Sequence, residues 1–326
     1  MRACVVHSAG DLRVEDREVS EPGPGEVAVA IAFGGICGSD LHYYHRGAVG
    51  DFQLREPLVL GHEVVGHVAG TPVAIHPATP CGNCEECARD HRNVCARSRY
   101  LGSAARFPHV HGGFAQRVVV PADQVRALPA GLELRRAVLA EPLSVALHAV
   151  RRAGDVTGRR VLVTGAGPIG CLVVAVLRHA GAAEVIVTDL LDAPLEIARQ
   201  VGATSVVRAD KPLPENVDVA IEASGSAAGL NTCVQRVRRA GTVVLLGLLP
   251  PGEVGFLGNV VVTREITMAG AFRFDHEFDE ALALLGAGLA VDPVVSHTFP
   301  LEESRAAFDI AGDRAVASKV LLDLRL

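Results

Sequence analysis

The sequence lacks the long hydrophobic runs that are typical of membrane-spanning proteins. No stretch of 18 uninterrupted apolar residues occurs among its 326 residues. The opening "MRACVVHSAGDLRVED" has no charged leader followed by an apolar run, so we expect a cytoplasmic protein that does not bind a membrane. Blocks of like charge are also missing and the formal net charge is −6, which argues against nucleic acid as a partner.

Internal repeats, low-complexity tracts and long linkers are absent as well, which excludes repeat and disordered architectures. Residues 1–138 contain short β-type runs such as "EVAVAIAFGG" and "FAQRVVVPA", separated by Gly and Pro, and predict an antiparallel, barrel-like domain. Residues 139–272 alternate apolar runs with helical segments, which indicates a parallel α/β sheet. In residues 273–326, "FDEALALLGAG" predicts a helix and "ASKVLLDLRL" a closing strand.

Cysteine is scarce outside one cluster, "CGNCEECARDHRNVC", in which four of the eight cysteines lie. Clustered cysteines in a reducing compartment favour a metal site over disulfides, and four thiolates leave no open coordination position, which is typical of structural zinc. His91 is then surplus. The predicted ligands are Cys81, Cys84, Cys87 and Cys95, and three other cysteines are expected to be buried packing thiols: Cys4, Cys171 and Cys233.

The motif "GAGPIG" follows the strand-like run "RRVLV" and precedes a helical run. Alone this motif is weak, since it can be a simple glycine turn. Here, however, the next strand ends in Asp189, where a carboxylate can bind the ribose hydroxyls of a dinucleotide. Asp189 would repel a 2′-phosphate and the nearby "LLDAP" supplies no cation, so NAD is predicted over NADP. The three glycines of the motif are Gly165, Gly167 and Gly170.

A second metal site is suggested by "GGICGSDLHYYHRG" and "VLGHEVVGH". A catalytic zinc needs three protein ligands and an exchangeable position, and Cys37, His62 and Glu63 are candidates. Taken singly each has a simpler explanation; His62, for example, fits a hydrogen-bonded core histidine. Asp40 is expected to orient His62 or the turn.

With these motifs in order, and with "AEPLSVALHAV" following the cysteine cluster, the sequence resembles the zinc-dependent medium-chain dehydrogenases. Within that family it is most similar to the polyol and sorbitol dehydrogenase branch, and "HYYHRGAVGDF" and "AFRFDHEFDEALALL" resemble its members that oxidise a sugar acid. The resemblance implies a GroES-like β-barrel catalytic domain, formed by both ends of the chain, and a Rossmann cofactor domain between them.

The family also implies roles for single residues. Glu141 stands near the catalytic zinc, either as a direct ligand or as the holder of its water. Ser39 is placed to accept the substrate proton and His42 to pass it to solvent, although Ser39 also suits a plain turn. Tyr43 and Arg273 match substrate-contacting positions. Further cofactor contacts implied by the family are Pro168, Ile169, Gly247, Leu248, Ala271, Phe272 and Arg273.

Three departures from the family pattern are visible. The segment between Glu63 and Cys81 is shortened, which puts the local barrel geometry in doubt. Pro194 replaces an arginine that contacts adenosine. His45 and Arg46 replace an acidic and a neutral residue, so that a cationic rim would favour an anionic aldonate over a neutral polyol.

The expected activity is therefore hydride transfer from a secondary alcohol of a polyol or aldonate to NAD. The alternatives are a sorbitol, xylitol or threonine-type dehydrogenase and, from another class, a non-catalytic NAD-binding scaffold. The resemblance also implies a homodimer or homotetramer, with pairing at a sheet edge after "GTVVLLG".

Overall fold

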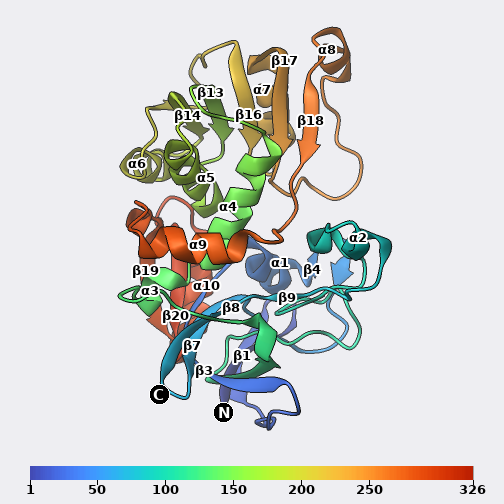
Figure 1. Ribbon diagram of the computed structural model, residues 1–326, viewed down its shortest axis with the longest axis vertical. Helices are drawn as coiled ribbons and strands as arrows, with labels where there is room; N and C mark the ends of the chain where they lie inside the picture. The colour runs from blue at the N-terminus through green and yellow to red at the C-terminus, as the bar shows by residue number, and fades with distance from the viewer. Residues whose placement is uncertain (326) are drawn as a thin grey trace.

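The ten-residue strand β3 (Glu26–Gly35) is the centre of the lower domain in Figure 1. In this computed structural model, which describes residues 1–325, β3 pairs antiparallel with β7 (Glu63–Val68), β11 (Arg117–Pro121) and the C-terminal β20 (Lys319–Asp323). The sheet has seven strands, with β11 also on β3, and their order is β12 (Val125–Ala127), β8 (Thr71–Ile75), β7, β3, β20 and β19 (Val295–Pro300). Because β20 closes onto β3, the two ends of the chain build one domain.

The other elements of this domain are short and lie around that sheet. The strands are β1 (Arg2–Ser8), β2 (Asp11–Asp16), β4 (Ala48–Val49), β5 (Phe52–Gln53), β6 (Leu58–Val59), β9 (Ala78–Thr79) and β10 (Arg99–Tyr100). The helices are α1 (Gly38–Arg46), α2 (Glu85–Ala88), α3 (Leu134–Ala137), α9 (Glu277–Gly286) and α10 (Ser304–Gly312), with 3₁₀ turns at Arg92–Val94, Ala122–Gln124, Asp292–Val294 and Leu301–Glu303.

The shortened segment after Glu63 is a tight hairpin between β7 and β8. Its two central residues, Ala69 and Gly70, both have positive φ, 48° and 85°, as a two-residue type I′ turn requires. The flanking pair Val68 and Thr71 is in register. The deletion therefore leaves the strand pairing of the barrel intact, and the doubt about its geometry is removed.

The upper domain is a six-stranded, all-parallel sheet in the order β15-β14-β13-β16-β17-β18 (Figure 1). Its strands are β13 (Arg160–Thr164), β14 (Glu184–Asp189), β15 (Ser205–Arg208), β16 (Val217–Glu222), β17 (Val237–Leu245) and β18 (Thr267–Gly270), and its helices are α5 (Pro168–His179), α6 (Asp192–Gln200), α7 (Ala227–Arg236) and α8 (Gly258–Thr263). The Rossmann arrangement expected from the βαβ rhythm is thus confirmed.

One apolar core runs through both domains along α4 (Ala140–Arg152). It joins Phe33 and Val65 of the barrel to the strands and helices of the cofactor domain. The predicted packing thiols Cys4, Cys171 and Cys233 are fully buried, and burial raises the pKa of each to about 12. Among the residues that the structure describes, no helix has the length and apolar character needed to cross a bilayer.

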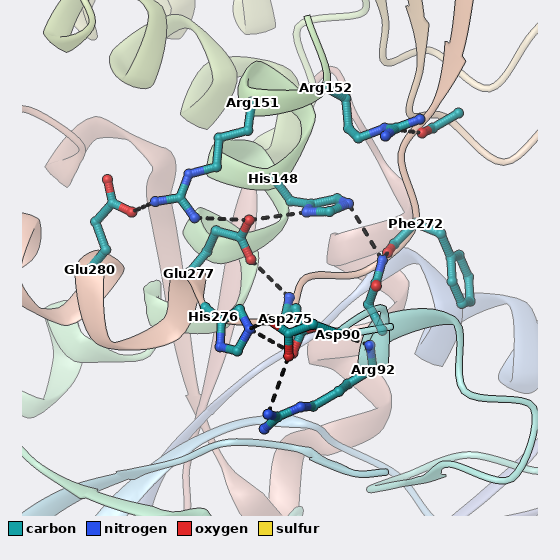
Figure 2. Close-up of polar contacts among 12 residues, drawn as sticks. Asp90, Arg92, His148, Arg151, Arg152, Phe272, Asp275, His276, Glu277 and Glu280 are labelled. Carbon is teal, nitrogen blue, oxygen red and sulfur yellow. Dashed lines mark hydrogen bonds and ion pairs between the residues drawn. The ribbon is translucent and has the colours of Figure 1, made fainter. Parts of the chain in front are cut away.

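The cysteine-rich lobe, residues 81–98, is docked against the segment that follows β18 (Figure 2). The Asn93 amide donates to the Phe272 carbonyl at 2.9 Å, and the Arg92 backbone N–H donates to Asp275 at 2.9 Å. His276 lies 3.1 Å from the carboxylate of Asp90. The lobe therefore holds the connection between the two domains.

Behind this contact lies the buried carboxylate of Glu277, shown in Figure 2. It is 3.0 Å from His148 Nδ1 and 3.1 Å from Arg151, and it accepts the Asp275 backbone N–H at 2.8 Å. Burial alone would raise the pKa of Glu277, but the hydrogen bonds from His148 and Asp275 outweigh it and lower the pKa to about 2.

We predict that Glu277→Gln destabilises the protein at neutral pH by about 2 kcal/mol. Because the folded-state pKa of Glu277 lies below its ordinary 4.5, its ionic contribution is complete above pH about 4.5 and is lost as the pH falls towards 2. Thermal unfolding between pH 7 and pH 3 checks this: the difference in Tm between wild type and variant should shrink below pH about 4.5.

The matched control is Glu280→Gln, which removes a half-exposed partner of the same Arg151 and should cost less than about 0.5 kcal/mol. Equal losses in the two variants, or a Glu277→Gln difference that does not change with pH, would contradict this account.

Candidate active site

Three side chains that can bind a metal meet where β3 ends and β7 begins. In the sheet Gly35 pairs with Glu63, so that Cys37, two residues beyond, lies next to His62. Ligand atoms of Cys37, His62 and Glu63 all lie within 4.8 Å of one another. A Cβ on Gly35 would stand 2.2 Å from a Glu63 carboxylate oxygen, so glycine makes room for this group. One ion can reach all three donors.

Asp40 fastens the two ligand loops together. Its buried carboxylate accepts the backbone N–H of Cys37 at 2.9 Å and that of Gly61 at 3.3 Å. Its distance to His62 Nδ1 is 3.9 Å, which is ion-pair range rather than a hydrogen bond. Of the two expected roles, holding the turn is thus the better supported by geometry.

Glu63 is paired on one side only. Its Oε1 lies 2.7 Å from the ammonium group of Lys319, which also donates to the Ile36 carbonyl at 3.0 Å. Burial lowers the pKa of Lys319, but the attraction of Glu63 outweighs it and the pKa is raised, so Lys319 is charged. Within residues 1–325, the other oxygen, Oε2, is buried and has no hydrogen-bond partner. An unpartnered buried carboxylate oxygen fits coordination by a cation.

The charge around His62 also suits a cation. Burial lowers the pKa of His62, yet the negative groups Asp40, Cys37 and Glu141 together raise it to about 10. The surroundings of His62 thus favour a positive charge at this place, and thiolate, imidazole and carboxylate are the donors that zinc takes. The residues present therefore fit a catalytic zinc.

Glu141, the first-turn acid of α4, lies beside the three-donor group. It accepts a hydrogen bond of 2.6 Å from the hydroxyl of Tyr100, which is buried. Burial, and then the charge of Glu141, hold the pKa of Tyr100 well above its usual value, so the phenol stays protonated as donor. The guanidinium of Arg273 lies 3.9 Å above the Tyr100 ring, and Arg273 itself has a positive φ of 54°. A direct bond from Glu141 to zinc stays a prediction.

The predicted proton path lies on α1. Ser39 and His42 are three residues apart, so they lie on one helix face, and Ser39 is close in sequence to Cys37. Burial, with the charge of Arg46 next, lowers the pKa of His42, so that it is neutral at pH 7. Tyr43 is 2% exposed, and its hydroxyl oxygen accepts the Ala104 backbone N–H at 2.9 Å. The hydroxyl hydrogen of Tyr43 remains able to donate.

The four cysteines of the lobe also converge. Three of their Sγ–Sγ distances are 3.5, 3.7 and 4.0 Å, for Cys95–Cys81, Cys84–Cys95 and Cys81–Cys87. Tetrahedral zinc with bonds of about 2.3 Å places its sulfurs roughly 3.8 Å apart. All four thiols are free of disulfides, whereas His91 is exposed and outside the group of candidate ligands. The cluster fits a closed, structural zinc.

The glycine-rich turn joins β13 to α5. Gly165 has φ 92°, and a Cβ on Gly170 would stand 2.0 Å from the Gly165 carbonyl oxygen, so both positions require glycine. A Cβ on Gly167 would meet no protein atom, which leaves open space before the N-terminus of α5. Pro168 is the first residue of that helix and Ile169 the second. The turn fits the pyrophosphate of a dinucleotide.

Asp189 is at the end of β14, as expected, and accepts the Ala166 backbone N–H at 2.8 Å. The sequence near it offers no cation, but the fold brings one: Arg314 donates to Asp189 Oδ2 at 2.5 Å. The segment "LLDAP" supplies no cation, as stated above, but a cation from a distant part of the chain lies at this carboxylate. Pro194 is buried in α6.

The predicted nicotinamide-side residues lie along two connections. Gly247 packs against Gly225 after β17, and Leu248 beside it is exposed. Ala271 donates its N–H to the Leu245 carbonyl at 2.9 Å, and Phe272 follows it, half-exposed. Their contacts to a cofactor stay predictions.

Comparison with known proteins agrees with this geometry. A family model for the alcohol dehydrogenase GroES-like domain matches residues 23–130, and one for zinc-binding dehydrogenases matches residues 168–287. Together they cover more than half of the chain. The chain belongs to the zinc-binding alcohol dehydrogenase family.

Among curated members of this zinc-binding family, L-idonate 5-dehydrogenase (NAD(P)(+)) of Escherichia coli is 36% identical over 98% of both chains. Sorbitol dehydrogenase of Homo sapiens is 35% identical over 94% of this chain and 91% of its own. The crystal structure of L-idonate 5-dehydrogenase from Escherichia coli has a TM-score of 0.95, covering 99% of this chain and 97% of that one. The expected fold is therefore confirmed. The expected family, whose members are zinc-dependent enzymes that use NAD(P), is confirmed as well.

Three residues of the site were missed by sequence reasoning: Tyr100, Arg314 and Lys319. A lysine at the start of the apolar run "KVLLDL" was a signal for Lys319, since a charge there must be paired if it is buried. Tyr100 and Arg314 carry no comparable local signal, because the partners of both are distant in the sequence.

We predict that wild type holds two zinc ions per chain and that the two sites respond differently to mutation. Cys95→Ser should remove one zinc and lower the Tm by several degrees. Cys37→Ser should remove the other and abolish turnover with little change in Tm. Metal analysis with calorimetry measures both, and His91→Ala is the control that keeps two zincs. Loss of turnover in Cys95→Ser with unchanged stability would reverse the assignment.

We also predict that Tyr100→Phe lowers kcat/KM about tenfold, because it removes a hydrogen bond to a buried carboxylate. Zinc content should stay at the wild-type level. Steady-state kinetics checks this, with Tyr44→Phe as a control that removes a hydroxyl from a tyrosine packed on Phe308. If both variants kept wild-type kcat/KM, the hydroxyl of Tyr100 would have no part in the site.

Proposed function

We propose that the protein is a zinc-dependent dehydrogenase that oxidises C5 of L-idonate to 5-keto-D-gluconate, with NAD preferred over NADP. The observation that carries the proposal is the group of Cys37, His62 and Glu63, in which one Glu63 oxygen has no partner within residues 1–325, in a chain that also has the glycine-rich turn of a parallel α/β domain. A bound zinc supplies Lewis acidity toward a substrate hydroxyl. A non-catalytic scaffold has no need for this second donor group.

Other residues of the site are proposed to transfer the proton, to lie beside the metal and to bind the cofactor. Ser39 accepts the proton of the substrate hydroxyl, and His42, neutral at pH 7, passes it to solvent. Glu141 is held by Tyr100 next to the metal ligands. Asp189 binds the ribose hydroxyls of the cofactor, which favours NAD.

The preference for a sugar acid rests on cations. Arg273 lies on the ring of Tyr100, whose hydroxyl bonds Glu141, so this charge is close to the metal ligands. His45 and Arg46 are exposed in the last turn of α1, the helix that Cys37 caps. A carboxylate on the substrate gains from these charges, whereas a neutral polyol does not. The similarity to L-idonate 5-dehydrogenase supports the same choice.

A sorbitol- or xylitol-oxidising enzyme is the second candidate, favoured by the similarity to sorbitol dehydrogenases, and a threonine-type dehydrogenase ranks behind it. We further propose a cytoplasmic homodimer or homotetramer. The sheet has edge strands β15 and β18, and β18, which follows "GTVVLLG" and pairs on one side with β17, is the edge that we propose for pairing between subunits.

We predict that kcat/KM for L-idonate exceeds that for sorbitol and xylitol by at least about tenfold, from one charged contact. A panel of aldonates and polyols with NAD and NADP, followed by absorbance of the reduced cofactor, measures it. Arg46→Gln and Arg273→Gln should reduce the rate with idonate more than that with sorbitol. Equal or higher kcat/KM with sorbitol would overturn the choice of substrate and leave the dehydrogenase class standing.

A further inference from the structure

An ion pair crosses from the catalytic part of the chain to the ribose carboxylate of the cofactor domain. Arg314 lies between α10 and β20, and Asp189 ends β14, 125 residues away in sequence. The guanidinium Nη2 is 2.5 Å from Asp189 Oδ2. The Asp189 side chain is 3% exposed, whereas that of Arg314 is 48% exposed. Arg314 therefore covers Asp189 while its other donors face solvent.

The ion pair occupies an acceptor position of Asp189 that a bound ribose would need. Oδ2 of Asp189 takes the Ala166 N–H at 2.8 Å and the Arg314 guanidinium, and Oδ1 takes the Leu191 N–H at 3.2 Å. A carboxylate has about four acceptor positions, so one remains free on Oδ1. The 2′ and 3′ hydroxyls of an adenosine ribose together need two. A ribose bound by both hydroxyls must take over the position that Arg314 holds.

Arg314 also offsets the charge that would reject a phosphorylated ribose. Alone, the carboxylate of Asp189 would repel a 2′-phosphate. A guanidinium carries five N–H donors in a planar fork that matches phosphate oxygens, and Arg314 uses one of them on Asp189. A short displacement from the carboxylate places the same cation next to a group on the 2′ oxygen.

Arg208, a second cation near Asp189, is already paired with acidic side chains. Arg208, paired with Asp189 in the sheet register, lies 3.3 Å from Asp192 and 3.6 Å from Asp210. Lys211 is 3.9 Å from Asp210. Within residues 1–325, Arg314 has Asp189 as its single ion-pair partner. A phosphate that binds Arg314 therefore breaks only one existing ion pair, whereas binding Arg208 would compete with two acidic residues.

We propose that Arg314 sets the choice between NAD and NADP, by competing with the hydroxyls of an unmodified ribose for Asp189 and by binding the phosphate when the 2′ oxygen carries one. The inference rests on the dinucleotide site of the proposed function, and it is independent of the sugar substrate. It deepens that function, because NAD remains the preferred cofactor while NADP is admitted through this residue.

The test measures binding of two cofactor fragments, ADP-ribose and 2′-phospho-ADP-ribose, to the zinc-loaded protein by isothermal titration calorimetry. For Arg314→Gln we expect the Kd of the 2′-phosphorylated fragment to rise about tenfold or more, the effect of one charge-assisted hydrogen bond. The Kd of ADP-ribose should stay the same or fall, since its competitor for Asp189 is removed. Arg314→Lys, which keeps the charge, should lose less.

Arg208→Gln is the matched control, and the ratio of its two Kd values should equal that of wild type. If Arg208→Gln rather than Arg314→Gln changed this ratio, or if Arg314→Gln weakened both fragments equally, the proposal would be wrong. If wild type bound neither fragment, the dinucleotide site itself would be wrong and the proposal would fall with it. Because no substrate is present, an incorrect assignment of the sugar leaves this result unaffected.

Discussion

The buried pair of Glu63 and Lys319 is the interaction on which the rest of the site depends. Glu63 begins β7 and Lys319 begins β20, and both strands flank β3. A buried charge without a partner is strongly destabilising, so the C-terminal strand must close on β3 before the metal donors are stable. The metal site therefore forms only when both ends of the chain have folded together.

The same C-terminal connection extends this constraint to the cofactor. Arg314 and Lys319 are five residues apart, one on the ribose carboxylate of the upper domain and the other on the metal ligand of the lower domain. The cysteine lobe is hydrogen-bonded to the segment that carries Arg273, at Phe272 and Asp275 (Figure 2). The Arg273 guanidinium in turn lies over the ring of Tyr100. The connection between α10 and β20 thus places Arg314 at the ribose carboxylate, and the connection after β18 places Arg273 at Tyr100.

Much of this could be predicted from sequence because the informative residues are local. The lobe cysteines lie within fifteen residues, and the glycine turn within six. Cys37 and the pair at 62–63 meet because two strands that are neighbours in the sheet carry them. The sequence departs from the family pattern after Glu63, and there it did not predict the local barrel geometry. It could not show that two residues with positive φ would close the hairpin.

The rest depends on contacts that no local pattern encodes. Tyr100 reaches Glu141 across 41 residues, Lys319 reaches Glu63 across 256, and Arg314 reaches Asp189 across 125. Each is an ordinary residue type in an ordinary stretch, and its role arises only when segments that are distant in the sequence fold together. Arg273 likewise reaches Tyr100 from a backbone conformation that is unusual for arginine, and sequence alone does not specify it.

The most direct test of this account is a crystal structure of the protein as purified, with anomalous diffraction recorded on both sides of the zinc absorption edge. We predict two zinc peaks per chain, one inside the four lobe cysteines and one bonded to Cys37 and His62 next to the free oxygen of Glu63. A single peak in the lobe, or a second one at the exposed group of Asp90, Asp275 and His276 with none at Cys37, would contradict it.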